Sequence, residues 1–115
     1  MLHKGACHCG KIAYEVDAEF DQAIECNCSH CSRKGYLLAF VPGESLSLLT
    51  DAAYCATYTF NKHQLQHHFC RTCGCAPYSE GRDPSGKAMA AVNLRCVEGV
   101  DLGKLKIVPV DGRSF

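Results

Sequence analysis

The sequence predicts a single mainly β domain, and three observations support this fold class. Several short apolar segments are bounded by Gly and Pro, whereas no stretch shows the period of a long amphipathic helix. Hydrophobic residues make up 47% of the 115 residues and charged residues 21%, as is typical of a globular chain. We find no linker, internal repeat or low-complexity segment, so residues 1–115 are interpreted as one domain.

The predicted elements follow in chain order. The sequence IAYEV alternates between apolar and polar residues, so residues 11–17 are predicted to form a half-buried strand. Residues 7–10 precede it and are interpreted as a tight turn between two strands. The apolar run GYLLAFV is followed by a Pro-Gly pair and predicts a buried strand at residues 35–41. Further strands are predicted at residues 45–49, 54–60, 66–69, 88–93 and 106–110, short helical turns at 21–25 and 29–34, and a polar surface loop at 81–87.

Cysteine is the outlier of the composition, with 10 residues, and most of them fall in three short clusters. These are CHC at residues 7–9, CNCSHC at 26–31 and CRTCGC at 70–75. Two cysteines one residue apart form a disulfide only with strain, whereas their thiolates share one metal ion easily. The first residues, MLHKGACHCG, lack the apolar core of a secretory signal, so we expect a reducing, cytoplasmic location. The clusters therefore predict bound metal, with zinc as the default for thiolate ligands and an iron–sulfur cluster as the alternative.

The spacing divides the clustered cysteines between two sites of different kinds. Cys7 and Cys9 flank one residue of a turn, and Cys70 and Cys73 form a CxxC pair followed by Gly74, which permits a sharp turn. Together these four cysteines predict a closed, four-thiolate site that ties the N-terminal hairpin to the later strands. A structural zinc site of this kind contributes on the order of 10 kcal/mol of folding free energy.

The middle cluster offers three thiolates, from Cys26, Cys28 and Cys31. Three protein ligands and an open fourth position are the arrangement of a reactive zinc ion rather than a structural one. Water, an external thiol, Cys75 and His30 are the candidates for the fourth ligand. If Cys75 or His30 took that position, the second site would be structural as well.

Other features of the sequence exclude some functions. Lys and Arg together number 12, as do Asp and Glu, so no basic excess favours nucleic acid. No apolar run approaches the ~20 residues that span a bilayer. Cys55 and Cys96 stand alone and are interpreted as structural residues of the core rather than reactive thiols. His63, His67 and His68 form a histidine-rich stretch, which we interpret as strand surface rather than a third metal site.

The motifs CHCG, CNCSHC, FCRTCGC, VNLRCVEGVDL and DGRSF, in this order, resemble the glutathione-dependent formaldehyde-activating (GFA) family. The resemblance covers nearly the whole chain, from His3 to Phe115. It implies a Mss4-like β-tent of small antiparallel sheets stapled by zinc. It implies a structural zinc held by Cys7, Cys9, Cys70 and Cys73, and a second zinc, with a substrate thiol beside it, held by Cys26, Cys28 and Cys31. Cys75 is a departure from the family pattern, because many relatives carry a small hydroxyl residue there.

The resemblance also implies an activity, the formation of S-hydroxymethylglutathione from formaldehyde and glutathione, which is classed as a carbon–sulfur lyase reaction. Glutathione has two carboxylates, so its site needs cations. The candidate cations, each of which is otherwise a solvated surface charge, are Arg33, Lys34, Arg71 and Arg95. The alternative function is a non-catalytic zinc-binding module that binds a thiol metabolite or a protein partner. The sequence leaves the oligomeric state open, a homodimer included.

Overall fold

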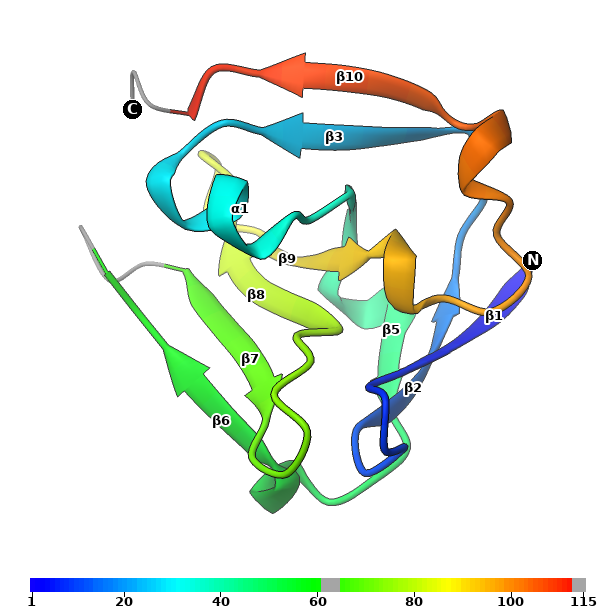
Figure 1. Ribbon diagram of the computed structural model, residues 1–115, viewed down its shortest axis with the longest axis vertical. Helices are drawn as coiled ribbons and strands as arrows, with labels where there is room; N and C mark the ends of the chain where they lie inside the picture. Colours follow the sequence, from blue (N-terminus) through cyan, green and yellow to red (C-terminus); the bar gives the residue numbers. More distant parts are fainter. Residues whose placement is uncertain (61–64, 113–115) are drawn as a thin grey trace.

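The computed structural model describes residues 1–60 and 65–112, and their strands form two sheets (Figure 1). The smaller sheet has the strand order β1–β2–β5 and the larger one the order β10–β3–β4–β9–β8–β7–β6. The bounds in the smaller sheet are Leu2–Ala6 for β1, Ala13–Asp17 for β2 and Leu46–Leu48 for β5. Those in the larger sheet are Gln22–Cys26 for β3, Leu38–Pro42 for β4, Cys55–Tyr58 for β6, Gln66–Cys70 for β7, Tyr78–Arg82 for β8, Ala88–Asn93 for β9 and Lys106–Val110 for β10.

Helical structure is short throughout the described residues. The helix α1 (Ser29–Lys34) packs on the larger sheet, and four single turns of 3₁₀ helix connect strands. These turns are η1 (Gly43–Ser45), η2 (Ala52–Tyr54), η3 (Leu94–Cys96) and η4 (Leu102–Lys104). Asp51, Asn93 and Asp101 begin three of them, because a short polar side chain can accept a backbone N–H of the turn. None of the helices in the described ranges is long and apolar enough to cross a membrane.

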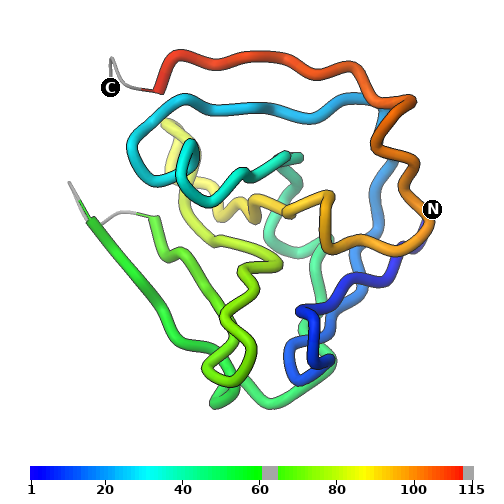
Figure 2. The backbone as a smooth tube through the Cα atoms, in the orientation of Figure 1, coloured from blue at the N-terminus to red at the C-terminus, as the bar shows by residue number. Residues whose placement is uncertain are grey.

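One strand pair is parallel, whereas the other paired strands are antiparallel. The last strand, β10, runs parallel to β3, so that Val110 lies opposite Cys26. The segment between β9 and β10 passes along the smaller sheet (Figure 2). There, Glu98 N donates to Lys4 O at 2.8 Å. The C-terminal part of the chain therefore links the two sheets, and its last described residues lie beside the middle cysteine cluster.

The main core lies between the two sheets. Tyr14 and Val16 of β2, and Ile12 just before this strand, belong to this core and pack in one cluster with Val92 and Leu94. A second, smaller cluster of buried residues lies where α1 packs on the larger sheet; it consists of Cys31, Tyr36, Leu38, Ala76 and Ala91. The two cores therefore sit on different sides of the larger sheet's middle strands.

The predicted mainly β fold, with antiparallel sheets, is confirmed, and so is the helical turn at residues 29–34. The helical turn predicted at residues 21–25 is wrong, because this segment is β3, held between β4 and the parallel partner β10. The loop predicted at residues 81–87 begins too early, since its first two residues belong to β8. The turn proper is held by the Asp83 carboxylate, which accepts the N–H groups of Ser85 and Lys87.

Candidate metal centres and the adjoining cleft

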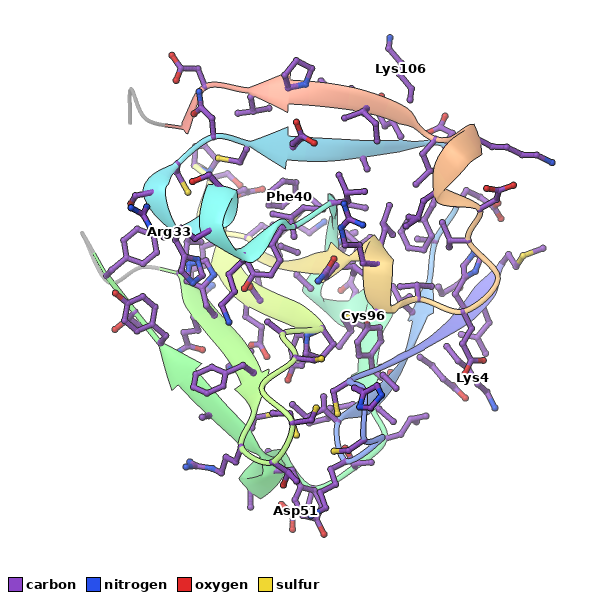
Figure 3. All side chains as sticks on the ribbon, in the orientation of Figure 1. Lys4, Arg33, Phe40, Asp51, Cys96 and Lys106 are labelled. Atoms are coloured by element: carbon purple, nitrogen blue, oxygen red, sulfur yellow. The ribbon has the colours of Figure 1, made fainter. Side chains whose placement is uncertain are left out.

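The first group of cysteines joins two distant turns of the chain. Cys7 and Cys9 follow β1, and Cys70 and Cys73 lie at the end of β7, where Gly74 takes a φ of +80° and its N–H donates to Cys70 O. The four sulfur atoms all lie within 4.8 Å of one another. Sulfur atoms gather at this place and, separately, beside the end of β3 (Figure 3). The predicted four-cysteine set is thus brought together in space.

The geometry of this group fits a tetrahedral zinc ion. Four sulfurs at ~2.3 Å from a central ion are about 3.8 Å apart, and the Cys7–Cys9 and Cys9–Cys70 sulfur pairs are separated by 3.8 and 3.6 Å. Backbone N–H groups also point at the sulfurs: that of Ile12 donates to Cys7 and that of Thr72 to Cys70. The N–H groups of Cys75 and Cys9 lower the pKa of the Cys73 thiol to about 5. Such donors stabilise thiolates and hold them in place as ligands.

The second group comes from one short segment. Cys26 is the last residue of β3, Cys28 precedes the first turn of α1, and Cys31 is buried inside that turn. Their three sulfurs lie within 4.8 Å of one another. Burial raises the pKa of the Cys28 thiol, but the Cys31 N–H, which donates to its sulfur at 3.2 Å, and the other donors around it outweigh burial and lower this pKa overall. Burial, by contrast, raises the pKa of the Cys31 thiol. It is therefore the closeness of the three sulfurs that fits a metal ion with three protein ligands.

The C-terminal segment forms a wall of the second group. Asn27 N donates to Val110 O at 3.1 Å, and Asn27 Nδ2 donates to Asp111 Oδ1 at 3.1 Å. These bonds bring Gly112 so close that a β-carbon there would overlap the Cys26 sulfur and would lie 3.1 Å from Cys28 Cβ. Sequence reasoning did not assign Gly112 a role, although the Asp-Gly pair of the DGRSF motif is the signal that marks it. Residues 113–115 of that motif lie outside the described ranges.

A cleft of about 470 Å³ opens beside the second group. Cys26 and Cys31 line it together with Tyr36 and Arg95, and the remaining wall comes mainly from β3, β10 and the residues that follow it. This volume is within the range of small-molecule sites, about 300–1,000 Å³. Burial, and then the charge of the Cys31 sulfur, raise the pKa of the Tyr36 phenol to about 12. The cleft thus combines thiolate groups, one phenol and one guanidinium group.

Neither candidate for a fourth protein ligand joins the second group among the residues that the structure describes. Cys75 lies in the turn of the first group, where its carbonyl accepts the Cys70 N–H at 2.9 Å. The His30 ring faces an aromatic cage, with its centroid 4.3 Å from that of His67 and 5.2 Å from that of Phe60. The cage also contains Tyr36 and Tyr58.

The four predicted cations lie in different places. Arg95 lines the cleft, and its Nε donates to Gly35 O at 2.9 Å. Arg33 lies on α1, where it donates to Ser29 O of the same helix (Figure 3), and the Lys34 ammonium group lies 5.5 Å from the centroid of the Phe69 ring. Arg71 lies beside the first cysteine group and donates to Ala53 O. The structure therefore brings Arg95 to the cleft and leaves the other three outside its lining.

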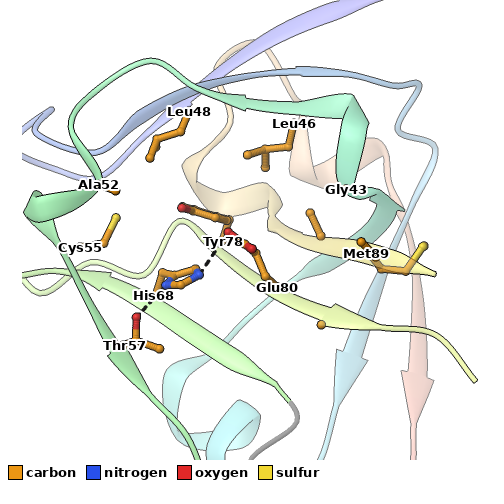
Figure 4. Close-up of a pocket in the computed structure, with 13 residues that line it drawn as sticks. Gly43, Leu46, Leu48, Ala52, Cys55, Thr57, His68, Tyr78, Glu80 and Met89 are labelled. Atoms are coloured by element: carbon orange, nitrogen blue, oxygen red, sulfur yellow. Dashed lines mark hydrogen bonds and ion pairs between the residues drawn. The ribbon is translucent and has the colours of Figure 1, made fainter. Parts of the chain in front are cut away.

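The neighbouring histidines of β7 face opposite sides of the larger sheet. His67 contacts His30 and bonds the Ser79 hydroxyl at 3.2 Å, whereas His68 lies in a pocket of about 410 Å³ between the sheets (Figure 4). There its Nδ1 bonds the Thr57 hydroxyl at 2.9 Å, and its Nε2 lies 3.3 Å from Glu80 Oε1. Two residues on opposite faces cannot share one ion, and His63 lies outside the described ranges. A third metal group is absent from the residues that the structure describes.

Comparison with known proteins adds to this geometry. Residues 2–107 match the model of the family described as glutathione-dependent formaldehyde-activating enzyme (GFA). The chain belongs to this family. A crystal structure of a protein from Rhodobacter sphaeroides is 33% identical to the chain, covers 91% of it and 99% of its own length, and superimposes with a TM-score of 0.78. The GFA match spans Arg95 and both cysteine groups, each of which could hold a metal ion.

Proposed function

We propose that this protein is a carbon–sulfur lyase of the GFA type that acts in the cytoplasm. It joins a glutathione-like thiol to formaldehyde to give the S-hydroxymethyl adduct, and it catalyses the reverse reaction. The observation that carries this proposal is the position of the three-cysteine group, which lines a cleft large enough for a small thiol and shares it with Arg95. Family membership supports the same pair of substrates.

Zinc is the metal that both thiolate sets fit. Cys7, Cys9, Cys70 and Cys73 would hold the structural ion, and Cys26, Cys28 and Cys31 would hold the second. A zinc ion there would lower the pKa of a thiol that joined its ligands, so that the substrate sulfur would be a thiolate at neutral pH. The cysteines of the second group would thereby fix where the reacting sulfur lies.

The side chains of the cleft suit the ionic end of a glutathione-like thiol. The Arg95 guanidinium is exposed at the cleft and binds a carboxylate of the substrate. Glu25 and Asp111 line the same cleft and provide negative charge for an ammonium group. Because thiols add to formaldehyde readily without a catalyst, the main contribution of the chain is to hold the two reactants close and oriented.

The first experiment compares the wild-type protein with Cys28→Ser, both purified under reducing conditions. We expect two zinc ions per wild-type chain and one in Cys28→Ser, with the far-ultraviolet circular dichroism unchanged. Adduct formation from glutathione and formaldehyde should be accelerated by the wild-type protein and not by Cys28→Ser. Cys55→Ser is the matched control, because Cys55 lies in neither group and should keep both ions and the activity.

Two results would contradict the proposal. Equal zinc content in wild type and Cys28→Ser would mean that the middle cluster holds no metal, and the lyase would lose its physical basis. If the wild-type protein bound glutathione but did not accelerate adduct formation, the alternative function, a non-catalytic zinc-binding module, would be supported instead.

A further inference from the structure

The space between the two sheets is not filled at the side where β5 and β6 lie. Both strands are edges of their sheets, and the pocket of about 410 Å³ opens there (Figure 4). Small side chains leave this room, since the lining includes Gly43, Ala52, Gly81, Ala88 and Ala90. The volume is within the range of small-molecule sites. The pocket shares no residue with the cleft or with either cysteine group, so it is a separate cavity.

Most of the wall is apolar. Leu46 and Leu48 line the pocket from β5, and Met89 lines it from β9 (Figure 4). These three side chains stay partly exposed, although the strands that carry them face the main core. Apolar surface in contact with water is stabilised when a hydrocarbon group covers it. The wall therefore suits the hydrocarbon part of a ligand.

The polar end of the pocket is a row of three side chains on neighbouring strands. Thr57 lies opposite His68 in the register of β6 and β7, and Glu80 follows on β8. The Thr57 hydroxyl bonds His68 Nδ1 at 2.9 Å, and Nε2 lies 3.3 Å from Glu80 Oε1. Because a carboxylate only accepts hydrogen bonds, we assign the hydrogen of the neutral ring to Nε2, and Nδ1 then accepts the hydrogen of the Thr57 hydroxyl. The Thr57 oxygen and the Glu80 carboxylate remain as acceptors.

The charge at this end is negative and accessible. No lysine or arginine is among the residues that line the pocket, and within the described ranges the ion pair of Glu80 is with His68. The Glu80 side chain is 51% exposed and Thr57 is exposed, so a ligand in the pocket can reach both. The Tyr78 hydroxyl is engaged by the Cys55 sulfur. A ligand that fits here brings positive charge and several N–H donors, as an ammonium group does.

We propose that this pocket binds a small primary amine in its ammonium form. The ammonium group donates hydrogen bonds to the Glu80 carboxylate and to the Thr57 oxygen, and the hydrocarbon group covers Leu46, Leu48 and Met89. Charge-assisted hydrogen bonds of this kind are stronger than those of a neutral group, so the site favours an amine over an alcohol of the same shape. The inference is independent of the proposed function, because no residue of the cleft takes part.

The two methionines of the chain give a direct measurement of binding. Met89 lines the pocket, whereas Met1 lies outside it. The zinc-loaded protein, labelled with carbon-13 in its methionine methyl groups, is titrated at pH 7.5 with 2-phenylethylamine, whose ring shifts the NMR signals of nearby methyl groups. We expect the Met89 signal to move to saturation and the Met1 signal to stay. The neutral 2-phenylethanol should bind at least about tenfold more weakly, and the anionic 3-phenylpropanoate should leave both signals in place.

Three variants locate the amine. Glu80→Gln keeps an acceptor for His68 but loses the charge, so the affinity for 2-phenylethylamine should fall at least about tenfold. Ala88→Leu fills the pocket from β9, where Ala88 is exposed, so binding should be lost while the melting temperature stays close to that of the wild type. Glu25→Gln is the matched control, because Glu25 lines the other cavity, and its affinity for the amine should equal that of the wild type.

Several results would overturn the proposal. Equal affinities for the amine and the alcohol would mean that the pocket does not recognise the charge. Joint movement of the Met1 and Met89 signals, or a loss in Glu25→Gln as large as that in Glu80→Gln, would place the amine elsewhere. A Met89 signal that does not move would mean that the pocket binds no amine. The comparison of the three compounds needs only the wild-type protein, so it decides the matter even if a variant fails to fold.

Discussion

The two cysteine groups differ in the number of their sulfur atoms, in the separation of these cysteines along the chain and in their position relative to the cleft. The first takes four sulfurs from two turns that are about sixty residues apart in the chain, with Cys7 and Cys70 buried. The second takes three sulfurs from six consecutive residues and lies at the edge of a cleft. A metal ion in the first group would close a long loop with its coordination complete, whereas one in the second would leave a position that a substrate could take. In the proposed function, the number of ligands and their separation in the chain thus distinguish a structural site from a reactive one.

The largest expected difference between the two groups appears when one ligand is removed from each. Cys70→Ser should abolish the native fold, because Cys70 is fully buried and the structural ion contributes on the order of 10 kcal/mol. Cys28→Ser should lose one zinc ion and keep a cooperative thermal transition. Circular dichroism melts with zinc analysis would measure both. If Cys70→Ser had the melting temperature of the wild type, the first group would not be the structural site that stabilises the fold.

The second prediction concerns the wall behind the second group. Gly112→Ala should weaken zinc binding at this group by roughly 10- to 100-fold, because the added β-carbon would displace Cys26 from its place among the ligands. The first ion and the melting temperature of the one-zinc form should be unaffected. Competition with a coloured zinc chelator would give the two affinities.

Gly103→Ala is the matched control for this experiment. The nearest atom to a β-carbon at Gly103 is Asp101 Oδ1 at 3.4 Å, which is an ordinary contact. Equal zinc affinities in Gly112→Ala and Gly103→Ala would show that the C-terminal segment does not shape the second group.

The contrast between the groups also separates what the sequence predicts from what it does not. Spacing alone predicts that the cysteines within each cluster lie close together, because they are one to three residues apart. That Cys7 and Cys9 meet Cys70 and Cys73, about sixty residues away, does not follow from spacing and was implied also by the family resemblance. The role of Gly112 could not be predicted, since it depends on the parallel pairing of β10 with β3, strands that are far apart in the chain. The same pairing explains why residues 21–25 were misassigned: QAIEC places one apolar residue, Ala23, in the buried core and has little strand character of its own. The strand β8, with the sequence YSEGR, is likewise imposed by β7 and β9 on either side of it.

The smallest predicted effect concerns the histidines beside the two groups. His8, next to the first group, is exposed, whereas His67, in the aromatic cage near the second, is 7% exposed. Burial, followed by the charges of His30, His68 and Lys34, lowers the pKa of His67 to about 4. The folded pKa is thus below the unfolded value of about 6.5, so protons bind more readily to the unfolded chain. The stability associated with neutral His67 is fully present above pH 6.5 and is lost as the pH falls toward 4.

Urea unfolding between pH 7 and 4.5, with zinc present in excess, measures this slope. Wild type and His8→Gln should lose stability in parallel over this range, because both retain His67. His67→Gln should show a shallower loss, since a glutamine at this position cannot take up the proton. Thiolates also bind protons and release zinc as the pH falls, but this contribution is common to the three proteins and cancels in the comparison. Identical slopes in wild type and His67→Gln would mean that His67 is not held neutral by its cage. The difference in burial between His8 and His67 would then have no consequence for stability in acid.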